Sequence, residues 1–196
     1  MPGPDRDSIA EEAARLVCRE ALTDYRAAKL KALDRLGMSA RSTALPDNAQ
    51  IDAAVIRYLQ LFGGAAYTER LQRLRTLAPR LMRQLSVFEP RLTGGAVSGA
   101  VTIAHHLQLH LFADQSESVD LFLFERGFTF DVSERRYRYP DGREENVPLL
   151  RLMLDGLGVD LAVFGLDDLR RTPISPQNGR PYQRLTQAEA EALAAA

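Results

Sequence analysis

The segment His106-Leu107-Gln108-Leu109-His110-Leu111 alternates polar and apolar residues at every position. Successive side chains of a β-strand point to opposite faces, so this alternation predicts a strand with its leucines buried on one face. His106, Gln108 and His110 would then share the other face. Before Pro90 the apolar residues recur at a helical spacing instead. The change of period predicts an α+β fold, with a helical first half and a small mixed or antiparallel sheet in the second half.

The region before Pro90 is expected to form about three amphipathic helices that pack with the sheet. Ser8 and Glu11 have the spacing of a capping box, which predicts the start of the first helix. Near Leu22 two interpretations stay open: one helix kinks there, or two helices meet. Asp47, or the residue after it, is expected to cap a later helix, because its short polar side chain accepts a hydrogen bond from an unpaired backbone N–H.

In the second half, one segment fits either a helix or a strand, and one expected strand is irregular. Residues 117–126 fit either a helix or a strand, because a helical start leads into a continuous apolar run. Further on, Phe130 and Val132 alternate with polar residues, but Tyr137 lies on the opposite parity. This slip predicts a bulge near residues 133–135.

The last part of the chain predicts a hairpin and a short terminal helix. Pro140-Asp141-Gly142 is a turn sequence, and the chain is expected to return as a strand over about 147–154. Residues 159–164 follow as a last strand. Thr186 and Glu189 form another capping box. We expect one compact domain with three regions: a helical region over 1–88, an α/β region over 89–170 and a tail over 171–196.

Composition predicts a cytoplasmic protein with no membrane association. Of the 196 residues, 45% are apolar and 26% are charged, which is the usual globular mixture. Cys18 is the single cysteine, so no intrachain disulfide can form, as in proteins of reducing compartments. The first seven residues carry acid and proline rather than a basic start and an apolar core, so no secretory signal is expected. Arg151, Asp155 and Asp160 interrupt the apolar stretch 149–166, which excludes a membrane span there.

Positive charge is concentrated in one segment of the first half, although the net charge is only −1. Between Ala65 and Leu85, five arginines are opposed only by Glu69. On a helix they indicate either a solvated face or a surface for the phosphates of RNA. The nucleic-acid hypothesis assigns that role to Arg70, Arg73, Arg80 and Arg83.

The histidines raise the question of a metal site. His106 and His110 would share one face of a helix, but on a strand they are roughly 13 Å apart at ~3.4 Å per residue, too far for one ion. The alternation favours the strand, so we predict no metal site and no cofactor. The sequence also has no G-x-x-x-x-G-K-[ST] loop for ATP and no G-x-S-x-G elbow for a serine nucleophile.

A glycine-rich turn, 94–99, comes just before the alternating segment. Its backbone N–H groups are placed to approach an anion, or it is simply a tight turn. Arg136 and Arg138 would project from one strand face and clamp a phosphate, unless they pair with Glu144 or Glu145 on the next strand. The candidate ligand-binding residues are Gly94, Gly95, Ser98, Gly99, His106, Gln108, His110, Arg136, Arg138 and Asp160.

This order of a glycine turn, an alternating strand and further strands resembles the core of the nucleotidyltransferase superfamily, the polymerase-β-like fold. The resemblance covers about residues 88–166. It implies a glycine pair that holds nucleotide phosphates, at Gly94-Gly95 or at Gly99-Ala100. It also implies two acidic residues on the next strand and a third on a later strand, which together bind two metal ions.

The acidic pair is missing from this sequence. The positions that the resemblance makes acidic are His106 and Gln108, or Gln108 and His110. Asp160 would match the later carboxylate alone. Neutral imidazoles and an amide do not replace carboxylates around Mg²⁺, which prefers charged oxygen ligands. The resemblance therefore implies a core whose metal chemistry is lost.

The whole chain also resembles a small bacterial protein family of similar length. The matching segments are D-Y-x-x-A-K-x-K-A at 24–32, L-P-D-N at 45–48, H-L-x-L-x-L-F at 106–112 and D-D-L-R at 167–170. Members of that family are labelled as UDP-N-acetylmuramate–alanine ligases. Such a ligase needs an ATP loop with G-K-[ST] and a much longer chain, so we do not expect that activity here.

The leading hypothesis is a degenerate nucleotidyltransferase-like domain that binds a ligand or partner without metal-dependent catalysis. A nucleotide or another phosphate-bearing molecule is the expected ligand class. One alternative is an RNA- or protein-binding adaptor that uses the arginine-rich helix. A second alternative is an active metal-dependent nucleotidyltransferase with rearranged acids, Asp114, Asp131 and Asp160.

Overall fold

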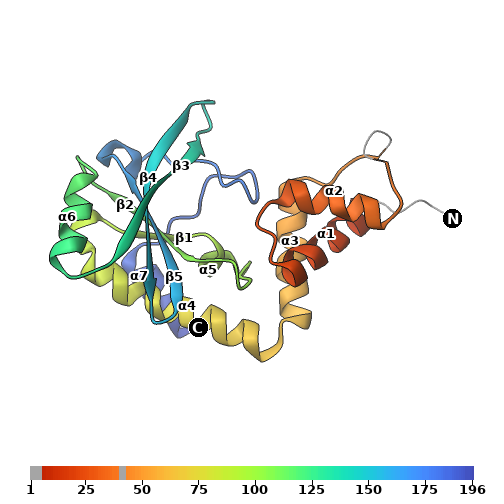
Figure 1. Cartoon of the computed structure of the whole chain (residues 1–196), viewed down its shortest axis with the longest axis horizontal. Helices are drawn as coiled ribbons and strands as arrows, with labels where there is room; N and C mark the ends of the chain where they lie inside the picture. The colour runs from red at the N-terminus through yellow and green to blue at the C-terminus, as the bar shows by residue number, and fades with distance from the viewer. Residues whose placement is uncertain (1–5, 40–42) are drawn as a thin grey trace. The chain divides into compact units, whose positions relative to one another are not determined.

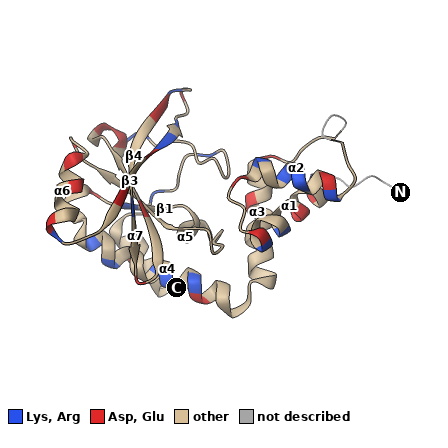
Figure 2. Cartoon of the chain, in the orientation of Figure 1, with Lys and Arg blue, Asp and Glu red and all other residues tan. Residues whose placement is uncertain are grey.

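The computed structural model describes residues 6–39 and 43–196 (Figure 1). The chain forms two compact units that interleave along the sequence. The helical unit consists of Met1–Arg70, Gly99–His105 and Ser175–Arg180. The sheet unit consists of Leu71–Ser98, His106–Ile174 and Pro181–Ala196. Figure 2 shows acidic and basic residues interspersed on both units, in keeping with the near-zero net charge.

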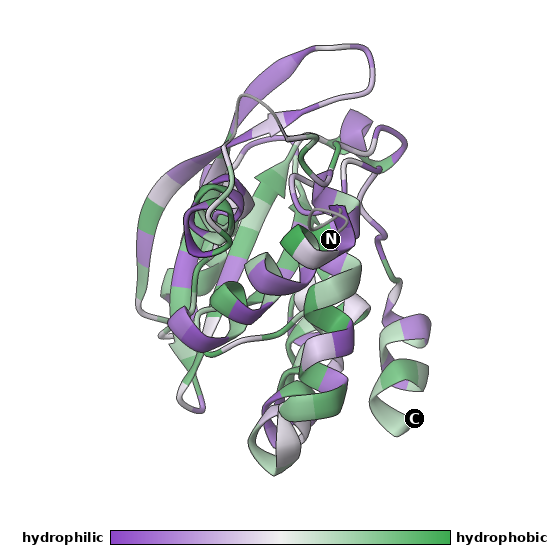
Figure 3. Cartoon of the chain, turned by 90° about the vertical axis from the view of Figure 1, so that its right-hand side faces the viewer, coloured by the Kyte–Doolittle hydropathy of each residue, from purple (hydrophilic) through white to green (hydrophobic). Residues whose placement is uncertain are grey.

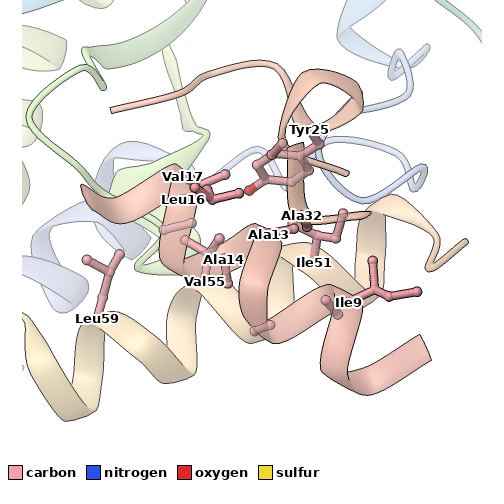
Figure 4. Close-up of a cluster of buried hydrophobic side chains, with 14 of the residues drawn as sticks. Ile9, Ala13, Ala14, Leu16, Val17, Tyr25, Ala32, Ile51, Val55 and Leu59 are labelled. Atoms are coloured by element: carbon pink, nitrogen blue, oxygen red, sulfur yellow. The ribbon is translucent and has the colours of Figure 1, made fainter. Parts of the chain in front are cut away.

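The helical unit is built from α1 (Arg6–Glu20), α2 (Tyr25–Arg35), α3 (Asn48–Phe62) and the first turns of α4 (Gly64–Gln84). Its core combines small residues of α1 with larger side chains of α3, as Figure 4 shows for Ala13, Ala14, Ile51 and Val55. Alanines on the buried face let two helix backbones approach closely, which increases packing contacts. The ring of Tyr25, from α2, closes this core beside Val17.

The described residues before Pro90 form four α-helices where about three were expected, because two helices meet near Leu22 instead of one kinked helix. Asp24 accepts a hydrogen bond from the Arg26 N–H and so starts α2. Asp47 and Gln50 form a complete capping box at α3, which confirms that expected start. The start predicted at Ser8 is wrong, since α1 already begins at Arg6. Part of the predicted loop after α2, residues 40–42, lies outside the described residues.

The sheet unit contains five strands in the order β1-β2-β5-β4-β3. The strands are β1 (Arg91–Thr93), β2 (Leu107–Phe112), β3 (Phe130–Arg138), β4 (Glu144–Leu154) and β5 (Leu157–Phe164). β2 and β5 pair in parallel, and every other neighbouring pair is antiparallel. The α+β fold with a mixed sheet is therefore confirmed.

The alternating segment 106–111 forms a strand from Leu107 onward, with its leucines buried on one face, as the sequence predicts. Leu107, Leu109 and Leu111 are fully buried on one face of the sheet. Gln108 and His110 project from the opposite face, which we call the polar face. Figure 3 shows hydrophobic and hydrophilic residues alternating along the helices, the pattern of amphipathic helices.

The open assignment of residues 117–126 resolves as a helix, α6 (Glu117–Glu125). The bulge expected near residues 133–135 is absent, because β3 and β4 pair without interruption from Phe130 to Arg138. The apolar side chains of β3 instead lie on different faces in its two halves. Val132, on the edge strand, stays 65% exposed, whereas Tyr137 is buried on the polar face.

Short elements complete the sheet unit. The 3₁₀ helix η1 (Ser86–Phe88) leads into β1, α5 (Gly95–Ser98) follows β1, and the 3₁₀ helix η2 (Leu166–Leu169) follows β5. Thr186 and Glu189 form the predicted capping box of α7 (Gln187–Ala195). Gln187 donates to the Pro79 carbonyl, which ties the start of α7 to α4. Among the described residues, no helix has the length and apolar character to cross a bilayer.

Candidate functional site

A row of polar side chains runs across the polar face of the sheet unit. Strand register places Thr93, Gln108, Asp160, Arg151 and Asp131 side by side on β1, β2, β5, β4 and β3. Cross-strand neighbours in register share a face, so these five residues form one continuous polar row. Asp160 lies at its centre.

Asp160 is a buried carboxylate surrounded by cationic or protonatable groups. Its side chain is only 5% exposed. One carboxylate oxygen, Oδ1, lies 2.8 Å from His106 Nδ1 and 3.7 Å from Arg151 Nε. The other, Oδ2, accepts a hydrogen bond from Arg135 Nη2 at 2.5 Å. Both carboxylate oxygens therefore already face hydrogen-bonding or positively charged groups of the chain.

His106 is held in place by Asp160 and by the backbone of β5. Its ring lies against Gly158, where a β-carbon would be 2.4 Å from its Cδ2 atom. Nδ1 is the ring atom on the carboxylate, so in the neutral imidazole Nδ1 carries the proton and Nε2 is unprotonated. Nε2 has no hydrogen-bond partner among the described residues, and the side chain is 40% exposed. The ring of His106 is therefore partly accessible to a ligand, and its Nε2 is not held by another described residue.

Arg135 stabilises the buried carboxylate from the edge strand. Burial disfavours its charge, but Tyr137 and Asp160 outweigh this effect, so the pKa of Arg135 is raised and the guanidinium stays charged. Arg151 is more accessible, with half of its side chain exposed and a 3.7 Å distance to Asp160. Arg151 is thus the cation of this row that can reach an incoming anion.

The β1 end of the row is formed by Thr93, Gly94 and Gln108. Thr93 is fully buried, and its hydroxyl has no partner within the described part of the chain. Gly94 has a φ of +73°, and a β-carbon there would lie 2.5 Å from Gln108 Oε1. Glycine at this position therefore allows both the left-handed backbone and the close approach of the Gln108 amide.

His110 shares the polar face, as predicted, but it is not available to a ligand. It is 1% exposed and is packed against Tyr137, Phe164 and Tyr182. Its Nδ1 accepts a hydrogen bond from Arg184 Nε at 3.0 Å. Burial, together with the nearby cations, holds the pKa of His110 well below its ordinary value. His110 is thus a neutral core residue.

Of the glycine-rich turn at residues 94–99, Gly94 is the glycine that contacts the polar row. Gly94 follows β1 directly and contacts Gln108, whereas Gly95 begins the one-turn helix α5. Ser98 ends α5, and its N–H donates to the Gly94 carbonyl. Gly99, with a φ of +90°, belongs to the helical unit, where its carbonyl accepts the Tyr67 hydroxyl.

Arg136 and Arg138 are not part of the polar row. Both have the parity opposite to Arg135, so they project from the other face of β3. Arg136 forms an ion pair with Glu144, which is the cross-strand alternative raised from the sequence. The backbone of Arg138 pairs with Ile174.

The arginines of α4 all have partners within the chain. Arg70 donates to the carbonyls of Thr102, Ile103 and His105 within the helical unit. In the sheet unit, Arg73 donates to the Asp155 carbonyl, Arg80 lies 3.7 Å from the Asp155 carboxylate, and Arg83 pairs with Glu191. These contacts give no specific support to a nucleic-acid surface on α4.

The rearranged acids do not form a visible metal centre. Across residues 6–39 and 43–196, no group of three or more His, Cys, Asp or Glu side chains is placed to hold a metal ion. Asp131 and Asp160 belong to β3 and β5, which are separated by β4. Two strand spacings of about 4.8 Å separate such residues by roughly 10 Å, beyond the reach of one ion.

Sequence reasoning found His106, Gln108, Gly94 and Asp160 but missed the two arginines that contact Asp160, Arg135 and Arg151. Arg151 interrupts an apolar strand, which is a signal that it faces a polar surface. Arg135 could not be assigned, because the expected bulge would have changed its face. The unpaired hydroxyl of Thr93 leaves no trace in the sequence.

Comparison with protein-family models, curated proteins and solved structures finds no match to this chain. Function therefore has to be inferred from the side chains themselves.

Proposed function

We propose that this chain is a degenerate nucleotidyltransferase-like domain that binds a phosphate-bearing ligand on the polar face without a divalent metal. Nucleotidyl transfer is not part of this function. The observation that carries the proposal is the environment of Asp160, the one carboxylate at the centre of the row. His106, Arg135 and Arg151 surround it where metal chemistry would need further acids.

The order of elements supports the family part of the proposal. β1, which Gly94-Gly95 follow, lies antiparallel to β2, and β5 with Asp160 lies parallel to β2 on its other side. A glycine turn, a second strand and a third-strand carboxylate are thus neighbours, as the nucleotidyltransferase resemblance implies. Asp160 is in register with Gln108, one of the positions that the resemblance makes acidic.

The exposed guanidinium of Arg151 supports an anionic ligand. Arg135 and Arg151 bring two permanent positive charges to the single buried carboxylate of Asp160. Asp131 lies in register with Arg151, so the two arginines offset the two carboxylates of the site, and no net negative charge is left to attract Mg²⁺. Because Arg151 is half-exposed, its guanidinium can form a bidentate, charge-assisted pair with a phosphate.

The unsatisfied polar groups support a polar ligand at the β1 end. A buried hydroxyl without a hydrogen bond costs about 1–3 kcal/mol. A ligand atom or a water that bonds Thr93 removes that cost. The Gln108 amide offers both a donor and an acceptor beside it.

Isothermal titration calorimetry of the full chain with ATP, GTP, a UDP-sugar and inorganic triphosphate, each in Mg²⁺ and in EDTA, tests the proposal. We expect binding of at least one phosphate compound in EDTA. Arg151→Gln should weaken it about tenfold or more, which corresponds to one lost charge-assisted hydrogen bond of about 1.5–3 kcal/mol.

Arg136→Gln is the matched control, since it removes an arginine from the other face of the neighbouring strand. Its affinity should equal that of the unmodified chain. Mg²⁺-dependent turnover of a nucleotide would refute the metal-free part of the proposal. No binding of any of the four compounds, or equal loss in Arg151→Gln and Arg136→Gln, would refute the site.

A further inference from the structure

We propose that His106 is a phosphoryl-accepting residue, modified at Nε2 by a phosphoryl donor with a good leaving group, such as an acyl phosphate. This inference rests on the proposed function, because the donor is a phosphate compound bound at the polar row. It adds a covalent step that anion binding alone does not require. It is based on the hydrogen bond between His106 and Asp160.

The geometry prepares one ring nitrogen of His106 as a nucleophile. An imidazole attacks through its unprotonated nitrogen, so the tautomer decides which atom reacts. Asp160 holds Nδ1 at 2.8 Å, and this hydrogen bond leaves Nε2 unprotonated. The contact with Gly158 fixes the plane of the ring. A nucleophile oriented by a carboxylate is the general arrangement of a side chain that forms covalent intermediates.

The electrostatics favour the product. A phosphorylated imidazole that keeps its Nδ1 proton carries a positive charge in the ring, and the adjacent Asp160 carboxylate stabilises that charge. Arg151 offers its guanidinium to the negative oxygens of the phosphoryl group. Because Arg151 is already protonated, it does not take up a proton during the reaction.

The step balances without an oxidant or a metal ion. The lone pair of Nε2 attacks phosphorus, and the Nε2–P bond forms. The bond between phosphorus and the acyl oxygen breaks, and its electron pair leaves with the carboxylate. The Nδ1 proton stays on the ring and remains hydrogen-bonded to Asp160.

The other two histidines provide a comparison within the chain. His110 is buried under Tyr182 and Arg184, so no donor reaches it. His105 belongs to the helical unit rather than to the polar row, and its Nδ1 contacts the Thr102 hydroxyl and accepts a hydrogen bond from the Thr102 N–H. Phosphorylation should therefore be selective for His106.

The experiment incubates the full chain with acetyl phosphate labelled with ³²P and locates the label by mass spectrometry under alkaline conditions. We expect acid-labile, alkali-stable label at Nε2 of His106, approaching one phosphoryl group per chain. His106→Gln should abolish it, and His105→Gln should leave it unchanged. Asp160→Asn should slow labelling about tenfold or more, because the amide no longer fixes the tautomer.

To separate the positioning role of Asp160 from an effect on the fold, the melting temperature of Asp160→Asn and its calorimetric affinity for inorganic triphosphate are also measured. Asp160→Glu serves as the conservative rescue. A slower rate at retained affinity, restored in part by Asp160→Glu, supports the positioning role of Asp160. Absence of label at His106 in a chain that binds triphosphate refutes this inference and leaves the proposed function intact. Equal labelling of His105 and His106 also refutes it. Failure to bind any of the four phosphate compounds refutes the proposed function instead.

Discussion

The imidazole ring of His106 occupies the space that a side chain at position 158 would take. A β-carbon built on Gly158 lies 2.4 Å from Cδ2 and 2.6 Å from Nε2 of His106. Non-bonded carbon atoms are normally about 3.5–4.0 Å apart, so the two groups exclude each other. The glycine of β5 and the histidine before β2 therefore act together to place Nδ1 on Asp160.

This relationship predicts that Gly158→Ala displaces His106 and disables the site. The added methyl group should cost about 1–3 kcal/mol of stability, as overpacking usually does. Labelling of His106 in Gly158→Ala should fall about tenfold or more, because the displaced ring loses the contact of Nδ1 with Asp160. Urea denaturation and mass spectrometry of the labelled chain measure the two effects. Gly165→Ala is the matched control, because a β-carbon there meets no atom within 4 Å; similar effects of the two variants would contradict the explanation.

Asp160 is predicted to stabilise the fold as well as to orient His106. Asp160→Ala leaves the partly buried guanidinium of Arg135 without its carboxylate, and breaking a buried pair typically costs about 3 kcal/mol. The free energy of unfolding from urea titrations at neutral pH should fall by about that amount. Asp131→Ala removes a carboxylate of the same row from the exposed edge strand and should change stability by less than about 0.5 kcal/mol. Equal effects would show that burial of Asp160 has no special role.

The fold was predictable from periodicity because side-chain pattern and burial are directly linked. The alternation of 106–111 placed β2 and its buried leucines correctly. The edge strand β3 was less predictable, since its outer apolar residue Val132 is exposed and Tyr137 packs on the opposite face. When the apolar residues of an edge strand change from one face to the other, the sequence pattern looks like that of a bulge, although the backbone pairing of β3 is regular.

The candidate site was predictable only in part, because its contacts are between distant strands. A single sequence shows that Gln108 and His110 share a face, but not that Tyr182 and Arg184 cover one of them. The pairing of β2 with β5, which brings Asp160 beside Gln108, is a parallel crossover contact across about fifty residues. No local pattern encodes such a register.

The buried hydrogen bond between Tyr25 and Asp52 predicts a stability effect in the helical unit. The Tyr25 hydroxyl donates to Asp52 Oδ1 at 2.8 Å, and Asp52 is 8% exposed. Burial raises the pKa of Asp52, and the hydrogen bond from Tyr25 partly opposes that rise. Tyr25→Phe removes the donor and should lower the free energy of unfolding by about 2 kcal/mol at neutral pH.

Asp52→Asn separates the charge from the hydrogen bond. Its amide oxygen still accepts from Tyr25 while the buried charge is gone, so its loss of stability should be smaller than that of Tyr25→Phe. Tyr58→Phe is the control, because the Tyr58 hydroxyl makes no hydrogen bond with any described residue. Chemical denaturation followed by circular dichroism compares the three variants. A Tyr58→Phe effect as large as that of Tyr25→Phe would count against the hydrogen bond.

His110 predicts a specific dependence of stability on pH. Burial, with Arg184 and Arg135 nearby, holds its pKa well below 6.5, whereas the unfolded imidazole takes up a proton near that value. The unfolded state therefore binds more protons as the pH falls below about 6.5, and the folded state loses stability by up to about 1.4 kcal/mol per pH unit from this group. Stability from this group is complete above 6.5 and declines below it. Urea denaturation between pH 7.5 and pH 5.5 should show the decline in the unmodified chain and a reduced slope in His110→Gln, which has no titrating ring. Because every other titrating group is common to both proteins, the difference between the slopes isolates His110, and identical slopes would mean that His110 does not remain neutral in the folded chain.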